Sequence, residues 1–339
     1  MEMDFQARNS RMLLRVECPQ LEPDNMPTPT IKPDTPYYFV LNSRSGSADA
    51  PQAKEVMQRM LQEARRPHEF FMVEDPSKIA EVAKRAASKA VETNGAVIAS
   101  GGDGTLAATA QAVLPTGQPF GIVPNGTFNY FGRAQEVPND VEAAMRIVLD
   151  PELRQVQVGT VNGRVFLVNA SLGLYPKLLH DRERFTHQYG RHRLVAMLAG
   201  VVTLLREHGQ LLLDIEADGK QQMIRTPTLF VGNNHLQLER VGLPEAEEVK
   251  EHRLAAIMMK PVSSKKLLWL ALRGALGQLG DDDRVINFSF SRLTVNSIHG
   301  AKGRRVEVAT DGERSWMRTP LKFEVAPKPL LLLSPKEET

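Results

Sequence analysis

The chain has 339 residues, of which 42% are hydrophobic, so it can bury the core of a globular protein of about two domains. Its 42 basic and 40 acidic residues give a net charge of +2 and an isoelectric point near 8.6, a balance that argues against a nucleic-acid binder. The single cysteine, Cys18, excludes an internal disulfide framework, argues against a zinc site and fits a reducing compartment.

The first 36 residues predict an irregular extension, because six prolines prevent a long helix or a central strand. From residue 37 to residue 150 apolar runs alternate with helical patterns. We expect strands at 37–41, 69–73, 96–100 and 120–123, and helices at 51–65, 77–91 and 106–113. This alternation is typical of a parallel sheet, so the sequence predicts an α/β domain over residues 37–150.

From residue 151 to residue 335 the pattern changes to short β-like runs separated by turn signals such as Asn162-Gly163 and Asp218-Gly219. We expect strands at 156–161, 165–169, 211–216, 223–232, 285–291, 293–297, 305–310 and 321–325. Helices are predicted at 193–207 and 264–279. The second domain is therefore expected to be mostly antiparallel, and a return of the last strand to the first domain stays open.

Three of the predicted strands in the first domain end in small, polar loops that contain glycine. These loops are Asn42-Ser43-Arg44-Ser45-Gly46, Gly101-Gly102-Asp103-Gly104-Thr105 and Pro124-Asn125-Gly126-Thr127. The carboxyl ends of parallel strands lie at one edge of a sheet, where ligands of open α/β folds bind. We expect the loops to line one crevice. Taken singly, the first loop is better explained as an ordinary βα turn, and the third is explained equally well as a plain Asn-Gly turn.

The second loop has the composition of a phosphate-binding turn. Gly101, Gly102 and Gly104 leave the main chain bare enough for N–H groups to approach phosphate oxygens, and the helix that follows adds its positive end. Asp103 repels a phosphate unless a metal ion or a reacting hydroxyl lies between them, as in kinases. The alternative is that Asp103 caps its own helix.

The second and third loops, the latter continuing as Phe128-Asn129-Tyr130-Phe131-Gly132-Arg133, together resemble the diacylglycerol kinase catalytic domain, which sphingosine and ceramide kinases share. Residues 42–46 resemble the first nucleotide loop of that family, and Asp311-Gly312-Glu313 its Asp-Gly-Glu turn. The resemblance spans about residues 37–335. It implies a Rossmann-like α/β nucleotide-binding domain of the NAD kinase and diacylglycerol kinase type, followed by a C-terminal β-sandwich, with ATP at the glycine loops and lipid in the cleft between the domains.

The resemblance also implies roles for single residues. The residues implied to surround ATP are Asn42, Ser43, Arg44, Ser45, Gly46, Gly101, Gly102, Gly104, Thr105, Gly126 and Thr127. Asp103 is implied to organise metal and hydroxyl, and Glu313 to accept the proton of the lipid hydroxyl. Asp311 competes with Glu313 for this role, although Asp311-Gly312 is also explained as a plain hairpin turn.

The sequence departs from the family pattern at three places, of which the replacement of a common aliphatic residue by Asn125 is minor. Leu106-Ala107-Ala108 stands where the family often has Leu-Asn-Glu, which removes two polar groups beside the nucleotide. Residues 250–255 (Lys-Glu-His-Arg-Leu-Ala) stand where bacterial members often hold a structural magnesium ion with carboxylates. We predict that this protein-held site is absent, since Mg²⁺ needs oxygen ligands, and that the Mg²⁺ bound to ATP remains. No residue is assigned as a metal ligand.

Membrane contact is expected to be peripheral at most. The longest apolar stretch, residues 194–205, is shorter than the ~20 residues that span a bilayer, and the chain start does not resemble a secretory signal. The basic segment 180–193 before it resembles an approach to anionic headgroups, and 265–270 is a weaker candidate of the same kind. A buried helix behind a basic loop explains the first segment equally well. His235 is interpreted as a polar loop residue.

The sequence thus predicts an ATP-dependent lipid kinase, cytoplasmic or peripheral at the inner face of the membrane, with no nucleic-acid partner and an unspecified oligomeric state. An NAD kinase-like phosphotransferase is the alternative among enzymes. A nucleotide- or lipid-binding module with weakened catalysis is the alternative from another class, suggested by Ala107 and Ala108.

Overall fold

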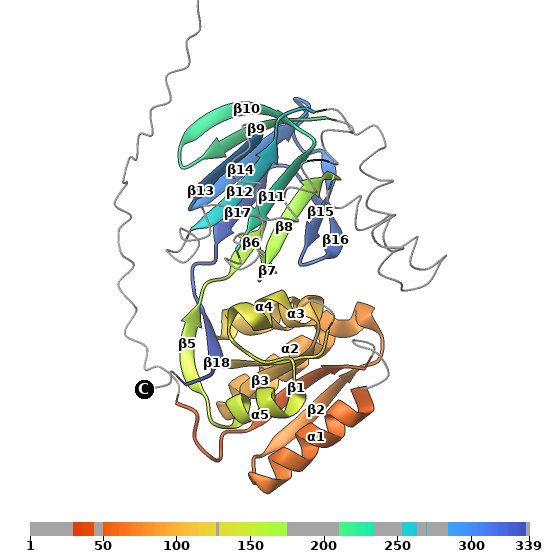
Figure 1. The fold of residues 1–339 in the computed structure, drawn as a ribbon, viewed down its shortest axis with the longest axis vertical. Coiled ribbons are helices and arrows are strands. Elements are labelled where there is room, and N and C mark those ends of the chain that lie inside the picture. The colour runs from red at the N-terminus through yellow and green to blue at the C-terminus, as the bar shows by residue number, and fades with distance from the viewer. Residues whose placement is uncertain are drawn as a thin grey trace, which may run out of the picture. The chain divides into compact units, whose positions relative to one another are not determined.

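The structure is a computed structural model, and it describes residues 30–43, 50–126, 129–174, 210–233, 253–262, 269 and 284–336 (Figure 1). The remaining residues include most of the predicted extension, the predicted helices at 193–207 and 264–279 except Trp269, both predicted membrane-contact segments except Trp269, and His235. In the part of the chain that the structure describes, no helix is long and apolar enough to cross a membrane.

The first domain is built on a sheet whose central strands are parallel. The strand order is β2 (His68–Val73), β1 (Tyr37–Asn42), β3 (Ala96–Gly101), β4 (Phe120–Pro124), β18 (Leu330–Ser334) and β5 (Glu152–Val156). Neighbouring strands from β2 to β18 are parallel, and β5 is antiparallel to β18. β1 and β3 are buried along nearly their whole length because helices cover both faces. The predicted α/β domain with a parallel sheet is confirmed.

The helices of this domain pack in two groups (Figure 1). They are α1 (Ala50–Glu63), α2 (Ile79–Thr93), α3 (Asp103–Val113), α4 (Tyr130–Ala134) and α5 (Val141–Leu149), with short 3₁₀ turns at Pro76–Lys78 and Leu114–Thr116. α1 packs against α5 on one face of the sheet, and α2 packs against α3 on the other. The buried side of α2 consists of alanines, which lets it approach β1 and β3 closely.

The second domain contains two antiparallel sheets of six strands. One has the order β10 (Lys220–Thr226), β9 (Leu211–Ala217), β14 (Arg292–Ile298), β17 (Leu321–Val325), β6 (Gly159–Val161) and β7 (Arg164–Phe166). The other has the order β13 (Val285–Phe290), β12 (Leu254–Met259), β11 (Thr228–Gly232), β8 (Asn169–Gly173), β15 (Arg305–Thr310) and β16 (Glu313–Arg318).

Both sheets contribute to one apolar core. Leu213 and Val295 of the first sheet and Leu172 and Val308 of the second are fully or almost fully buried in the same cluster. Successive side chains of a strand point to opposite faces, so each strand can supply alternate residues to this layer. The C-terminal β-sandwich that the family resemblance implied is confirmed.

Three predicted strands are wrong as continuous elements, because each is divided between sheets. The predicted strand 165–169 begins in β7 of one sheet and ends at the first residue of β8 in the other. The predicted strand 156–161 ends in the first domain as β5 and resumes in the sandwich as β6. The predicted strand 223–232 breaks at Pro227, which lacks the N–H that a ladder requires, so that β10 and β11 lie in different sheets. β12 and β16 were not predicted; β16 is an edge strand with mostly polar residues.

Candidate active site

The turn after β3 begins α3 at Asp103, three residues earlier than predicted. Gly102 occupies the N-cap position with an extended backbone, and its carbonyl accepts hydrogen bonds from the N–H groups of Thr105 at 2.8 Å and Leu106 at 3.0 Å. The first N–H groups of a helix have no acceptor within the helix itself. The turn therefore offers donors and a positive helix end to an anion, as a phosphate site requires.

The three predicted loops come together as far as the structure describes them. A Cβ atom on Gly126 would lie 2.5 Å from Cα of Gly102, so only glycine fits at this contact between the second and third loops. The N–H of Asn125 donates to the carbonyl of Gly101 at 2.9 Å. From the first loop, Nδ2 of Asn42 donates to Oγ1 of Thr105 at 3.1 Å.

Ser43 points to the neighbouring strand, since both its N–H and its hydroxyl donate to the carbonyl of Val73, at 3.2 and 2.9 Å. Arg44, Ser45, Gly46 and Thr127 lie outside the described residues. Their predicted contacts with ATP therefore remain predictions.

The Asp103 carboxylate joins the second loop to the start of α4. Its two oxygens accept hydrogen bonds from the N–H groups of Tyr130 at 3.3 Å and Phe131 at 3.2 Å. Burial raises the pKa of Asp103, and these backbone bonds partly offset the effect. The alternative interpretation of Asp103 as the cap of its own helix is wrong, because no side-chain bond caps α3.

Asn129 fixes the third loop and has no role in the sequence-based assignment. It is buried, has a positive φ of 50°, and makes two bonds to Gly126: Oδ1 accepts from the N–H, and Nδ2 donates to the carbonyl, each at 3.0 Å. Nδ2 also donates to Oδ1 of Asn139 at 2.9 Å. The sequence signal was an asparagine directly before a helix, a position that tolerates the left-handed conformation.

The Asp311 carboxylate binds three consecutive backbone N–H groups in the β7–β8 connection. Oδ2 accepts from Leu167 at 2.7 Å, and Oδ1 accepts from Val168 at 2.8 Å and from Asn169 at 3.0 Å. Burial of the carboxyl group raises its pKa to about 7 against the lowering effect of these bonds, and the charge of Asp103 adds to the rise. Asp311-Gly312 is also the two-residue turn between β15 and β16, with positive φ at both residues.

Asn233 holds the same connection from its carbonyl side. Its Nδ2 donates to the carbonyl of Leu167 and its N–H to the carbonyl of Val168, each at 2.9 Å. The carbonyl of Asn169 accepts from the N–H of Asp311 at 2.9 Å. Every main-chain polar group of residues 167–169 thus has a partner, and this segment forms a fixed base for the Asp311 turn.

Glu313, the first residue of β16, lies against the first turn of α3. A Cβ atom on Gly104 would be 3.1 Å from Oε1 of Glu313 and 3.3 Å from its Cγ. The Glu313 side chain is exposed, and within the described ranges its carboxylate has no hydrogen bond or ion pair. Of the three candidate catalytic carboxylates, Asp103 and Asp311 accept backbone hydrogen bonds. Only Glu313 has no hydrogen-bond or ion-pair partner among the described residues.

A glutamine holds α3 against the sandwich near this point. Nε2 of Gln111 donates to the carbonyl of Gly163 at 3.2 Å, and its Oε1 accepts from the N–H of Val165 at 2.7 Å. These bonds link the helix that begins at the glycine turn to the β6–β7 hairpin. The position of α3 against the sandwich is therefore fixed by the Gln111 bonds as well as by the contact between Gly104 and Glu313.

The first part of the chain, residues 36–161, matches the family model of the diacylglycerol kinase catalytic domain. This match agrees with the resemblance that the sequence motifs of the first domain indicated. A diacylglycerol kinase of Staphylococcus haemolyticus is 38% identical over 87 residues, which are 25% of this chain and 26% of the relative. A diacylglycerol kinase of Staphylococcus saprophyticus is 33% identical over 106 residues, which are 31% of this chain and 35% of the relative.

These alignments span only about a quarter to a third of the curated relatives. Solved structures are similar over more of the chain. A crystal structure of a diacylglycerol kinase from Bacillus anthracis strain Sterne superposes with a TM-score of 0.62 at 17% identity, covering 89% of this chain and 97% of that one. A second crystal structure from the same strain gives a TM-score of 0.67 at 18% identity, with the same coverage. At this identity the likeness establishes the fold.

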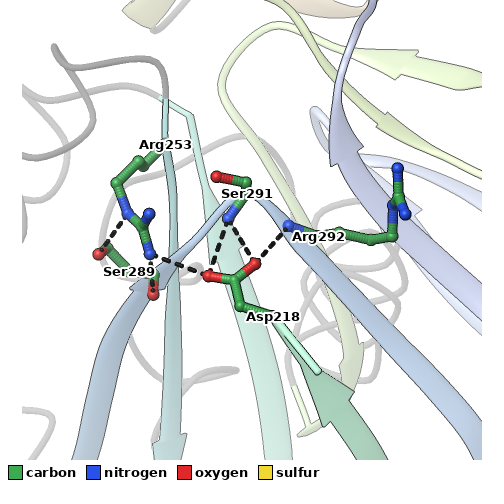
Figure 2. Close-up of polar contacts among 5 residues, drawn as sticks. All are labelled: Asp218, Arg253, Ser289, Ser291 and Arg292. Carbon is green, nitrogen blue, oxygen red and sulfur yellow. Dashed lines mark hydrogen bonds and ion pairs between the residues drawn. The ribbon is translucent and has the colours of Figure 1, made fainter. Parts of the chain in front are cut away.

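The described residues hold no group of three or more His, Cys, Asp or Glu side chains suited to a metal ion. Of the segment 250–255, only residues 253–255 are described. Figure 2 shows the Arg253 guanidinium among oxygen atoms: it donates to Oγ of Ser289 at 2.8 Å, to the carbonyl of Ser289 at 3.0 Å and to Oδ2 of Asp218 at 3.0 Å. A side-chain cation thus occupies this oxygen cluster.

Asp218 also connects the two sheets at this place. Its carboxylate accepts from the N–H groups of Ser291 at 3.2 Å and Arg292 at 3.1 Å, in the connection between β13 and β14 (Figure 2). Asp218-Gly219 forms the predicted two-residue turn between β9 and β10. Like Asp311, Asp218 is a turn residue whose side chain holds a distant piece of backbone.

Proposed function

We propose that the chain is an ATP-dependent lipid kinase that transfers the γ-phosphoryl group to a hydroxyl of diacylglycerol or a related lipid. The observation that carries this proposal is the position of the uncommitted Glu313 carboxylate on the glycine turn of α3. A phosphate-binding turn and a free proton acceptor at one place are the minimum that phosphoryl transfer to an alcohol requires. The match of residues 36–161 to the diacylglycerol kinase catalytic-domain model supports the same reaction class.

The glycine loops suit the phosphates of ATP. Gly102 and Gly126 are in contact, so their main chains can lie close to a ligand without side chains between them. The positive end of α3 then faces the phosphate oxygens. Mg²⁺ bound to the ATP phosphates would neutralise the charge that moves with the phosphoryl group.

In the proposed reaction, the hydroxyl oxygen of the lipid attacks the γ-phosphorus of ATP. The bond from this phosphorus to the bridging oxygen breaks, ADP leaves, and the hydroxyl proton passes to Glu313. Asp103 and Asp311 act as positioning residues, because their carboxylates are already bonded to backbone N–H groups of α4 and of residues 167–169. Asp103 shapes the nucleotide loops, and Asp311 holds the turn that carries Glu313.

The proposed lipid site lies between the first turn of α3 and the sandwich, and the proposed place of action is the inner face of the cytoplasmic membrane. Phosphoryl transfer in mixed micelles tests the activity. Purified protein with γ-labelled ATP and Mg²⁺ should label diacylglycerol or a related lipid, and should label NAD at least tenfold more slowly. Labelling of NAD alone would support the NAD kinase-like alternative. ATP binding without labelling of any acceptor would support the binding-module alternative.

A further inference from the structure

The outer face of the β15–β16 hairpin combines an exposed tryptophan with several basic side chains. In the register of the two strands, Trp316 lies opposite Glu307 and Arg318 lies opposite Arg305. Met317, between the two β16 residues, packs against the core of the sandwich, so Trp316 and Arg318 point away from that core. We call the surface formed by Trp316, Arg318 and Arg305 the hairpin strip; Lys302 and Arg304 are exposed in the segment that leads into β15.

Trp316 is the most exposed large hydrophobic side chain of the described residues, with 62% of its surface accessible. Trp269, the other tryptophan, lies beside the guanidinium of Arg284. An indole ring has an apolar body and a polar N–H, which suits it to the boundary between water and a bilayer. The solvent-exposed position of Trp316 therefore needs an explanation other than packing.

The basic residues of the strip have no acidic partner in the described ranges. Arg305 and Arg318 are directly opposite each other, an arrangement in which like charges destabilise the strand pair. Arg304 is next to them, because its carbonyl accepts from the N–H of Thr319 at 3.1 Å. The nearby Arg314, by contrast, pairs with Glu307 at 3.0 Å. The strip thus presents unneutralised positive charge around an exposed aromatic ring.

We propose that the hairpin strip docks on an anionic membrane surface. Basic side chains near such a surface gain electrostatic energy, and tryptophan anchors at the headgroup level. Arginines on an edge strand also prevent edge-to-edge pairing, but an exposed tryptophan among them would work against that purpose. The nearly neutral chain and the presence of one aromatic ring in the strip favour a membrane over a single-stranded nucleic acid, which binds through several stacked rings.

The strip lies on the same hairpin as Glu313. Glu313 and Trp316 are three positions apart, which corresponds to about 10 Å along β16. Docking through the strip would therefore keep the Glu313 carboxylate near the membrane surface, where the hydroxyl of a lipid substrate is found. This consequence rests on the proposed lipid-kinase function, whereas docking itself does not.

Sedimentation with lipid vesicles tests the docking directly. The full chain should bind vesicles that contain phosphatidylglycerol, bind phosphatidylcholine vesicles much more weakly, and lose binding as salt is raised. The double variant Arg305→Gln/Arg318→Gln should lower the partition coefficient about tenfold or more. A matched control, Lys220→Gln/Arg225→Gln, removes two exposed charges from β10 and should change it less than threefold.

Fluorescence tests the role of the ring. Trp269→Phe leaves Trp316 as the only tryptophan, and its emission should shift to shorter wavelength when phosphatidylglycerol vesicles are added. Unchanged emission, or vesicle binding that the double variant does not weaken, would overturn the proposal. Binding to a single-stranded oligonucleotide that the double variant abolishes, without vesicle binding, would overturn it as well and assign the strip to nucleic acid.

A kinase assay separates this proposal from the proposed function. With a short-chain, water-soluble diacylglycerol, the double variant should phosphorylate at the wild-type rate, since the strip does not touch the site. On vesicles its rate should fall with its binding. Vesicle binding with no phosphorylation of any lipid would sustain docking and refute the kinase.

Discussion

The Glu313 carboxylate lies so close to Gly104 that a Cβ atom at Gly104 would be 3.1 Å from Oε1. This contact joins the glycine turn, near the beginning of the chain, to a turn close to its end. Asp103 directly precedes Gly104, and Asp311 lies two positions before Glu313. The carboxylates of Asp103 and Asp311 both accept hydrogen bonds from backbone N–H groups. The geometry therefore assigns different tasks to three carboxylates that look alike in the sequence.

Replacement of Gly104 by alanine should displace Glu313 while leaving the fold intact. Alanine favours the helix by up to ~1 kcal/mol, so the melting temperature of Gly104→Ala should be unchanged or higher. Its kcat should fall at least tenfold, because the methyl group pushes the carboxylate from the turn. The substitution Glu313→Asp shortens the side chain. It should lower kcat by a smaller factor in the Gly104→Ala background than in the wild type. A wild-type kcat for Gly104→Ala would contradict the assigned contact.

The Asp311 carboxyl group should make stability depend on pH. Its pKa is about 7 in the folded protein against an ordinary 3.8, so the folded state holds the proton more tightly. This contribution to stability is fully present below about pH 4 and is lost as the pH rises to 7. The unfolding free energy of wild type minus that of Asp311→Asn should therefore fall between pH 4 and 7, by at most about 1.4 kcal/mol per pH unit. Denaturant titrations at several pH values measure this difference in unfolding free energy. A difference that stays constant or rises between pH 4 and 7 would contradict the raised pKa of Asp311.

Asp103→Asn should loosen the junction between α3 and α4. One of the two backbone bonds is lost, because the amide group keeps only one acceptor oxygen. Amide hydrogen exchange at Tyr130 and Phe131 should accelerate, and both the Kd for ATP and kcat should worsen. Lower kcat with unchanged exchange and unchanged ATP affinity would instead indicate a direct catalytic role.

Arg253→Met should destabilise the sandwich by about 1–2 kcal/mol, because three bonds of one guanidinium are lost. Arg292→Met is the matched control: it removes an exposed ion pair with Glu324 at 3.4 Å and should cost about 0.5 kcal/mol or less. Both values come from urea titration. An equal loss of unfolding free energy in the two variants would show that the Arg253 hydrogen bonds do not stabilise the sandwich.

Much of the fold followed from local patterns. The alternation of buried strands and helices between residues 37 and 124 placed β1, β2, β3 and β4 within one or two residues, because both faces of this sheet are apolar. The sandwich was harder to predict. A strand such as β16 carries mostly polar residues at a sheet edge, and its place is set by pairing with β15.

The motifs singled out the candidate residues of the site, but the contacts of their side chains could not be predicted. Nothing in the order of residues 311–313 shows that Asp311 bonds to backbone more than 140 positions away, while Glu313 has no bonded partner among the described residues. Asn233 was missed because it bonds to a segment 66 positions away, which one sequence does not display. Asn129 was missed although its bonds to Gly126 span only three positions. Asp311-Gly312 and Asp218-Gly219 are both hairpin turns, and only the structure shows what each aspartate holds.

Single-turnover phosphoryl transfer by Glu313→Gln tests the central claim most directly. With saturating ATP and a lipid acceptor that the wild type labels, the variant should transfer γ-phosphate about 10²- to 10⁴-fold more slowly, with unchanged Kd for ATP and unchanged melting temperature. Glu216→Gln, at an exposed position of β9, should behave as wild type. A wild-type transfer rate for Glu313→Gln would contradict the assignment of Glu313 as the proton acceptor.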